Sequence, residues 1–337
     1  MTTADITVQH AVALSPAQIS DVLQLINATA QADGTMPISE HVLLHLRQGG
    51  DAHGQHLLAR DSDDHLVGYA HLDVTDTVQG ASAEILVEPQ RRREGVGRTM
   101  ITALDDLVAG SRLRLWAHGE QPGARELAES LGFRSVRVLW QMRRSLLAAL
   151  PRPVIPPGIE IRSFDPAADC DAWVALNARA FSNHPEQGGW TRADLDLRMS
   201  EPWFDPAGFL LATQVETGAL VGFHWTKVHG FDPAEGHTHA HGHVQAHHST
   251  HAASHTHAHE PIGEVYVVGV SPDYRGSGLG RALTILGLEH LRHLGLAQAM
   301  LYVDAGNTRA IRLYEGLGFA RWDTDVMYQR QASANVR

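Results

Sequence analysis

A glycine-containing loop pattern occurs twice in the chain, and each copy is followed by a second repeated pattern. The first copy reads Glu-Pro-Gln-Arg-Arg-Arg-Glu-Gly-Val-Gly-Arg over 88–98, and the second reads Ser-Pro-Asp-Tyr-Arg-Gly-Ser-Gly-Leu-Gly-Arg over 271–281. Further along, Leu-Gly-Phe occurs at 131–133 and again at 317–319. Two patterns that recur in the same order predict two copies of one folding unit.

The length of the chain and a proline-rich segment fit this duplication. A chain of 337 residues exceeds the usual size of one domain and accommodates two domains of about 150 residues. Residues 151–158 are rich in proline, which lacks an amide donor and favours extended backbone, so they predict a linker. We therefore expect an N-terminal domain over 1–150 and a C-terminal domain over 159–330.

Both halves combine helical and strand periodicity, which predicts an α/β fold. A helix follows each glycine loop, and Gly132 and Gly318 are placed to cap later helices. The expected elements are helices over 17–31, 96–109, 168–181 and 279–294, and strands over 56–60, 66–73, 209–215 and 220–228.

Composition and charge restrict the functional classes. The net charge of −11 argues against a nucleic-acid-binding surface and fits a small amine-bearing substrate. We find no secretory signal near residue 1, and no apolar run approaches the roughly 20 residues that span a bilayer. We therefore expect a cytoplasmic protein with neither a membrane nor a nucleic-acid partner. The single cysteine, Cys170, has no nucleophile motif around it and is expected to be a small buried side chain.

A histidine-rich segment interrupts the second repeat. Ten histidines occur over 237–259, interleaved mainly with Ala, Thr, Ser and Gly. This composition has too little apolar surface to fold alone, so it predicts a mobile insertion between two strands. The alternative is loose binding of zinc, nickel or copper, because histidine is a common metal ligand. No cysteine pattern accompanies the segment, which argues against a structural zinc site, and we expect no obligatory metal.

Both glycine loops are suited to bind a diphosphate. A helix N-terminus presents backbone N–H groups and a partial positive charge to an anion, and glycines let a phosphate approach the backbone closely. Arg92 and Arg93 in the first half, and Arg275 and Arg281 in the second, add charge-assisted contacts. Neither loop has the dinucleotide pattern Gly-x-Gly-x-x-Gly or the P-loop ending Gly-Lys-Ser/Thr.

The remaining pattern, Arg-x-x-Gly-x-Gly after a Val-x-Pro strand, resembles the GNAT superfamily of acetyltransferases. The resemblance implies two tandem GNAT domains, each a mixed, mostly antiparallel sheet flanked by helices, with acetyl-CoA as co-substrate. It also implies that the strand before each loop is splayed so that its backbone pairs with the pantetheine arm, and Gly269 suits a bulge there. The implied cofactor residues are Ile85, Leu86, Val87, Arg93, Glu94, Gly95, Val96, Gly97, Arg98, Val268, Gly269, Val270, Arg275, Gly276, Ser277, Gly278, Leu279, Gly280, Arg281, Asn307, Thr308, Arg309, Ala310, Ile311 and Arg312.

Acetyl transfer to an amine requires a base that takes a proton from the ammonium, and it benefits from an acid that protonates the leaving thiolate. GNAT enzymes often place a Glu before the loop and a Tyr on the last helix, which implies Glu264 and Tyr314 as catalytic residues. Asn307 lies two helical turns before Tyr314 and shares its face. Alignment of the repeats places Ala81 opposite Glu264 and Ala128 opposite Tyr314. The first half is therefore expected to bind acetyl-CoA without catalysis.

Longer motifs resemble the mycothiol synthase family. They are His-Pro-Glu-Gln-Gly-Gly-Trp at 184–190, Trp-Phe-Asp-Pro at 203–206, Gly-Phe-His-Trp-Thr-Lys-Val-His at 222–229, Gly-Glu-Val-Tyr-Val-Val-Gly-Val at 263–270, Trp-Ala-His-Gly at 116–119 and Gln-Met-Arg-Arg at 141–144. These enzymes acetylate the cysteinyl amine of a cysteine–glucosamine–inositol pseudo-disaccharide. The resemblance implies this small-molecule substrate, whose hydroxyls and ammonium need polar partners. We also expect the protein to be a monomer. The implied substrate contacts are Glu40, Glu186, Lys227, Glu264 and Tyr302.

Two other functions stay open at this stage. The first is a GNAT enzyme that acts on an aminoglycoside, a peptide N-terminus or a polyamine. The second is a protein without catalysis, either a tandem acetyl-CoA sensor or a metal-binding protein that uses the histidine-rich segment.

Overall fold

The computed structural model describes residues 6–48, 54–74, 80–109, 112–119, 121–182, 185–229 and 261–330. The histidine-rich segment over 237–259, for which a mobile insertion was predicted, lies outside the described residues. The chain divides into two compact units. Unit 1 comprises Met1–Gln141, Asp304–Gly306 and Trp322–Arg337, and unit 2 comprises Met142–Val303 and Asn307–Arg321.

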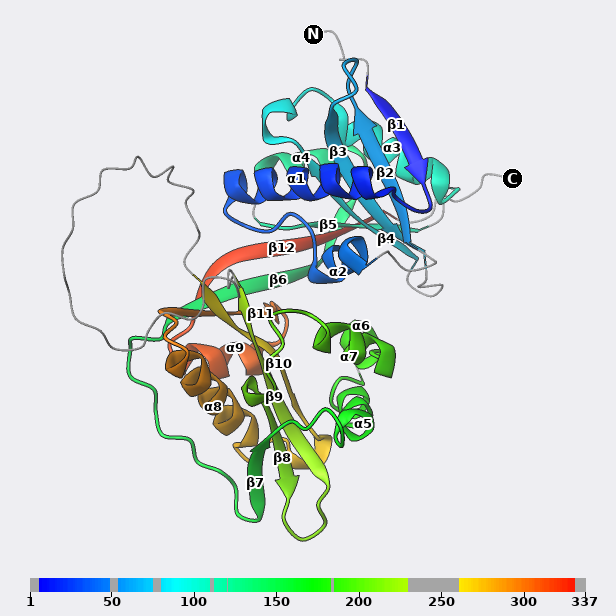
Figure 1. Ribbon diagram of the computed structural model, residues 1–337. Coiled ribbons are helices and arrows are strands. Elements are labelled where there is room, and N and C mark those ends of the chain that lie inside the picture. The colour runs from blue at the N-terminus through cyan, green and yellow to red at the C-terminus, as the bar shows by residue number, and fades with distance from the viewer. Residues whose placement is uncertain are drawn as a thin grey trace, which may run out of the picture. The chain divides into compact units, whose positions relative to one another are not determined.

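Unit 1 is a mixed sheet between two pairs of helices (Figure 1). Its neighbouring strands are, in order, β1 (Thr7–Ala11), β2 (Gly54–Arg60), β3 (Leu66–Asp73), β4 (Ala81–Val87), β5 (Leu113–Ala117) and β12 (Ala320–Arg330). Its helices are α1 (Pro16–Asp33), α2 (Glu40–Gln48), α3 (Val96–Leu107) and α4 (Pro122–Ser130). Only the β4–β5 pair is parallel among these described pairings. Leu58, Tyr69 and Leu86 pack under α1 and α2, whereas Leu57, Ala70 and Met100 belong to the core beneath α3.

Unit 2 repeats this design with a strongly aromatic core. Its neighbouring strands are β11 (Gln298–Asp304), β10 (Ile262–Val270), β9 (Leu220–His229), β8 (Phe209–Gln214) and β7 (Ile159–Ser163). Its helices are α5 (Cys170–Ala180), α6 (Pro185–Gly188), α7 (Arg192–Met199), α8 (Leu279–His293) and α9 (Thr308–Glu315). Trp173 of α5 packs against Phe209, Phe223 and Trp225 on one face of the sheet. Leu283 of α8 packs against the other face.

The last strand of each repeat passes from the unit of the helices that precede it into the other unit. Strand β12 follows α9 of unit 2, but its residues Val326–Arg330 pair antiparallel with β5 of unit 1. Strand β6 (Arg134–Ser145) follows α4, and the chain from Met142 onward belongs to unit 2. There the amide of Leu146 donates to the carbonyl of Ala297 over 2.8 Å. The compact units therefore differ from the contiguous ranges 1–150 and 159–330, because strand pairing follows spatial neighbours rather than chain order.

All eight helices and strands expected from the sequence occur in the structure. They are α1, α3, α5 and α8, and β2, β3, β8 and β9. The predicted glycine caps are confirmed, since Gly132 and Gly318 follow their helices with φ of 81° and 85°. Cys170 is buried as expected, and burial raises the pKa of its thiol. The proline-rich linker contains neither helix nor strand over 151–158. Among the described residues, none of the helices has the length and apolar character needed to cross a membrane.

Candidate active site

The glycine loop of unit 2 connects β10 to α8 through a tight turn. A short 3-10 turn over Pro272–Tyr274 follows the strand, and Gly276 and Gly278 then adopt φ of 90° and 89°. Residues other than glycine rarely adopt this backbone conformation, so Gly278 is the residue that lets α8 begin at Leu279. The turn directs the N-terminus of a 15-residue helix, and its partial positive charge, toward the carboxyl end of β10.

The corresponding loop of unit 1 has the same turn but different arginine contacts. Gly95 adopts φ of 95° at the start of α3, and Arg93 adopts φ of 68° where unit 2 has Gly276. The guanidinium of Arg92 forms two hydrogen bonds of 2.8 and 2.7 Å with the carboxylate of Asp33. Its counterpart Arg275 instead donates to a neutral backbone carbonyl. The positive charge of Arg92 is therefore compensated within the chain.

The parallel strands diverge beside both loops. In unit 1 the described β4–β5 pairing runs from Ala81 to Glu84, and in unit 2 the β10–β11 pairing covers Gly263 and Glu264. Residues 85–87 and 268–270 continue to pair on their other side, with β3 and β9. These segments therefore sit where the sheet opens, as the resemblance to GNAT proteins predicts for the strand that meets pantetheine.

The bulge in β10 lies at Tyr266 and not at Gly269, so this expectation was wrong. The register with β9 shifts between Val265 and Val267, whereas Gly269 pairs regularly with Phe223. A Cβ atom at position 269 would overlap the ring of Phe223, which explains the glycine by packing.

The bulge also corrects the comparison of the two repeats by one residue. Glu264 pairs with Lys227 across the ladder. In unit 1 the pair Val87 and Gly68 corresponds to Val270 and Gly222 at the loop end of the ladder. The ladder pair that corresponds to Glu264 and Lys227 is then Ser82 and Asp73. The counterpart of Glu264 is therefore Ser82 rather than Ala81, because the extra residue in β10 shifts the alignment. A serine hydroxyl is not a base at neutral pH, so the absence of a carboxylate at this position in unit 1 still holds.

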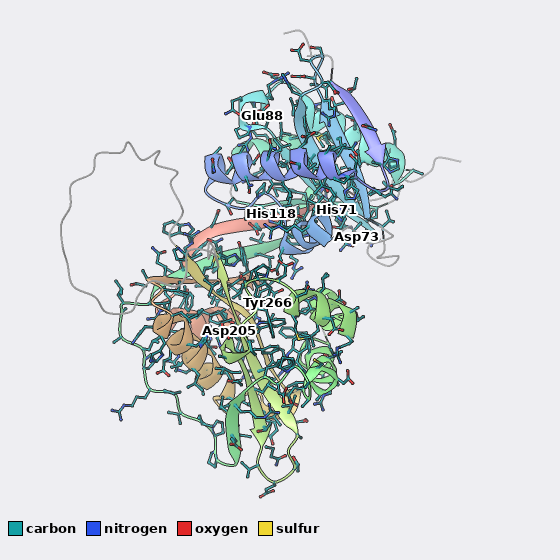
Figure 2. The ribbon with its side chains drawn as sticks, viewed as in Figure 1. His71, Asp73, Glu88, His118, Asp205 and Tyr266 are labelled. Atoms are coloured by element: carbon teal, nitrogen blue, oxygen red, sulfur yellow. The ribbon has the colours of Figure 1, made fainter. Side chains whose placement is uncertain are left out.

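Glu264 is a nearly buried carboxylate with two basic neighbours. Its residue is 7% exposed, and Nε2 of His229 lies 2.6 Å from its Oε2. Burial raises the pKa of Glu264, but the hydrogen bond from His229 and the charges of His229 and Lys227 outweigh this effect and lower it below the ordinary value. The ammonium of Lys227 lies 4.7 Å from the ring centroid of Trp203 and 5.5 Å from that of Tyr266, which Figure 2 labels. The carboxylate is thus ionised and able to accept a proton.

Tyr314 lies in the last turn of α9 and is half-buried. Burial raises its pKa to about 12, so the phenol is protonated at neutral pH. The backbone of Phe319 donates to the carbonyl of Tyr314 over 3.0 Å, and Phe133 donates to Ala128 over the same distance in unit 1. These matching bonds confirm that Ala128 is the counterpart of Tyr314.

The other predicted site residues occupy varied positions. Asn307 is the N-cap of α9, and its Oδ1 accepts from the amide of Ala310 over 3.1 Å. Tyr302 is 40% exposed on β11, and Glu40 is the first residue of α2 in unit 1. The side chain of Glu186 lies outside the described residues. The roles of these residues in binding stay predictions.

Sequence reasoning missed a buried charge cluster in unit 1. His118, which Figure 2 labels, lies just after β5. Its Nε2 lies 3.3 Å from a carboxylate oxygen of Glu84, and its Nδ1 lies 3.1 Å from a carboxylate oxygen of Asp325 in β12. Glu84 also accepts a hydrogen bond from the backbone of Ser39, just before α2. Burial lowers the pKa of His118, but hydrogen bonds and charges from both acids raise it to about 10. The motif Trp-Ala-His-Gly pointed to His118, but nothing in the sequence pointed to Asp325.

Comparisons with known proteins agree with the two-unit architecture. Residues 171–319 match the acetyltransferase (GNAT) family, and residues 52–135 match a second GNAT domain. A solved GCN5-related N-acetyltransferase from Sphaerobacter thermophilus is 25% identical, with a TM-score of 0.67 over 98% of this chain and 97% of its own. A tandem GNAT protein from the clavulanic acid biosynthesis pathway has the same fold, with 19% identity and a TM-score of 0.69 over 98% of this chain and 100% of its own.

Closer relatives identify the family. The mycothiol acetyltransferase of Acidothermus cellulolyticus is 51% identical over 96% of this chain and 94% of its own length. That of Streptosporangium roseum is 48% identical over 96% of this chain and 99% of its own length. The chain therefore belongs to the mycothiol acetyltransferase family, and it is an acetyl-CoA-dependent N-acetyltransferase with two GNAT domains.

Proposed function

We propose that unit 2 transfers the acetyl group of acetyl-CoA to the cysteinyl amine of 1D-myo-inositol 2-(L-cysteinylamino)-2-deoxy-α-D-glucopyranoside, giving mycothiol and CoA. The observation that carries this proposal is the ionised carboxylate of Glu264 at the point where β10 and β11 diverge beside the glycine loop. The names of relatives about 50% identical over nearly the whole chain support the choice of substrate.

Glu264 is the general base of this reaction. The substrate amine arrives as an ammonium, and the carboxylate takes one of its protons, directly or through water. The neutral nitrogen then attacks the thioester carbonyl, so that an N–C bond forms and the C–S bond breaks. The phenol of Tyr314 gives its proton to the departing sulfur, for which its raised pKa of about 12 keeps it protonated until the thiolate forms.

Acetyl-CoA and the pseudo-disaccharide are held by different groups. The glycine loop of unit 2 and the N-terminus of α8 receive the diphosphate, with Arg275 and Arg281 nearby, and residues 268–270 pair with pantetheine. Lys227 and Tyr302 provide polar contacts to the sugar and inositol hydroxyls, and Glu40 and Glu186 complete the proposed set.

Unit 1 holds a second acetyl-CoA without catalysing transfer. The turn at Gly95 supports binding because α3 begins after a left-handed glycine, as α8 does in unit 2. Ser82 and Ala128 stand in place of Glu264 and Tyr314, so unit 1 lacks the base and the acid. We further propose that the protein acts as a monomer in the cytoplasm, where acetyl-CoA is available; light scattering that reports the 36.8 kDa mass of one chain would test the monomer.

The deciding experiment mixes purified protein with acetyl-CoA and the cysteinyl pseudo-disaccharide and follows both CoA release and product mass. We expect CoA release matched by a product that has gained one acetyl group on its amine. If the protein binds acetyl-CoA and acetylates another amine but leaves the precursor unchanged, the proposed substrate is wrong and the assignment as an N-acetyltransferase still holds.

A further inference from the structure

Glu264 must lose a proton after each acetyl transfer if it is to act again. This requirement rests on the proposed function, in which the carboxylate takes a proton from the substrate ammonium. The side chain of Glu264 is only 9% exposed, so direct exchange with bulk water is restricted. A side chain that touches this carboxylate and is itself exposed would provide a route for the proton.

One titratable side chain of unit 2 lies in that position. Nε2 of His229 lies 2.6 Å from Oε2 of Glu264, and the His229 side chain is 33% exposed. Lys227 is the direct ladder partner of Glu264, and His229 lies two residues further along the same strand. Side chains two residues apart point to the same face of a sheet, so the diagonal contact follows from the register.

The second basic neighbour is less suited to carry the proton. Lys227 is 7% exposed, and its ammonium lies over the rings of Trp203 and Tyr266. The faces of the two rings attract this ammonium and hold it in place. Imidazole, by contrast, has two ring nitrogens that can each hold a proton, and the side chain of His229 is one-third exposed.

We propose that His229 is the proton relay of the active site, which accepts the proton from the Glu264 carboxyl through Nε2 and releases it to water. In this step the neutral imidazole carries its proton on Nδ1, so the carboxyl O–H bond breaks as an N–H bond forms at Nε2, and the imidazolium then gives its Nδ1 proton to water. Proton exchange with water afterwards returns the ring to the Nδ1–H form, which leaves Nε2 able to accept in the next turnover. The same hydrogen bond orients the carboxylate for the next substrate. His229 touches the base rather than the substrate, so it is a positioning residue.

Unit 1 provides an internal contrast. His118 also contacts a buried glutamate, but a second carboxylate, Asp325, faces its other nitrogen, and its side chain is 12% exposed. Such an imidazolium is held on both sides and has no comparable path to solvent. The buried glutamate of unit 2 thus faces a histidine that is one-third exposed, whereas the buried glutamate of unit 1 faces a histidine enclosed between two carboxylates.

The test compares His229→Ala and His229→Gln with the wild type in buffers of low and high imidazole concentration. We expect His229→Ala to lower kcat about 10- to 100-fold, with little change in KM for acetyl-CoA, because loss of a proton carrier affects turnover. Added imidazole should restore part of the rate in His229→Ala. In His229→Gln the amide retains a hydrogen-bond donor and fills the site, so turnover should be low and insensitive to imidazole. Three outcomes would each contradict the relay. They are a wild-type kcat in His229→Ala, full activity in His229→Gln, and a loss of activity in His229→Ala that added imidazole does not relieve.

A measurement without turnover separates this inference from the proposed function. The pKa of Glu264 can be followed by NMR on protein labelled with ¹³C at glutamate side chains, with Glu264→Gln used for assignment. Removal of the His229 hydrogen bond should raise the pKa of Glu264 in His229→Ala. An unchanged pKa would overturn the inference even if the wild type makes mycothiol. If the pKa of Glu264 rises in His229→Ala but the wild type never acetylates the precursor, the contact between His229 and Glu264 is supported and only the proposed substrate is wrong.

Discussion

Two protonation states in unit 2 are set by the surroundings of single residues. Basic neighbours keep Glu264 ionised, and burial keeps the phenol of Tyr314 protonated. We expect Glu264→Gln to lower kcat about 100- to 1000-fold and Tyr314→Phe about 10- to 100-fold, because each removes a proton-transfer group. Both variants should bind acetyl-CoA as the wild type does in calorimetry. Unchanged turnover in either variant would remove that residue from the mechanism.

A second residue-scale prediction concerns the charge of Arg92 in unit 1. Its ion pair with Asp33 competes with any diphosphate at the loop. Asp33→Asn should therefore strengthen acetyl-CoA binding at unit 1 about threefold to tenfold, since the guanidinium becomes available to the anion. Calorimetry that resolves two binding events measures this effect. Asp21→Asn is the matched control, because it removes a carboxylate that pairs with Arg60 instead, and equal affinities in both variants would show that the Asp33 pair has no such effect.

The sequence predicted individual site residues where spacing alone determines their position. Ala128 and Tyr314 could be matched because both precede a Leu-Gly-Phe turn by the same interval. The match of Glu264 failed by one residue because a bulge adds a residue to one strand without leaving a mark in the sequence. His229 is the last residue of the motif over 222–229, but only the strand register shows that its ring contacts Glu264.

At the scale of elements, the two glycine turns differ in importance for catalysis. Gly278 and Gly95 both adopt left-handed backbone before a helix. Aspartate at either position strains the turn and places a negative charge beside the diphosphate site. We expect Gly278→Asp to abolish turnover, whereas Gly95→Asp weakens acetyl-CoA binding at unit 1 and leaves kcat within about twofold. Steady-state kinetics and calorimetry on both variants decide this, and inactivity of a folded Gly95→Asp protein would assign unit 1 a part in the reaction.

Elements with long periodic patterns were the ones that sequence reasoning found. Helices such as α1 and α8 have buried faces that repeat over at least two turns, and strand β9 is a continuous run that is buried over most of its length. The five-residue strands β1, β5 and β7 are too short to show a clear alternation. The pairing of β12 with β5 could not be predicted, because a strand's own residues do not specify which repeat it joins.

At the scale of the whole molecule, the stability of unit 1 depends on residues that come last in the chain. Asp325 of β12 reaches His118, which also contacts Glu84, so one buried imidazolium connects three elements. The pKa of His118 rises from 6.5 to about 10 on folding. Its contribution to stability is therefore complete below about pH 6.5 and is lost as the pH rises toward 10.

This linkage makes a measurable difference to unfolding. Between pH 6.5 and 10 the free energy of unfolding of the wild type should fall more steeply than that of His118→Gln, by at most about 1.4 kcal/mol per pH unit. Urea unfolding of both proteins, followed by the fluorescence of the tryptophans at several pH values, gives the two slopes. Asp325→Asn should reduce the slope as well, since it removes one of the two charges that hold the proton. Parallel slopes in wild type and His118→Gln would mean that the imidazole of His118 has the same pKa in the folded and unfolded chain.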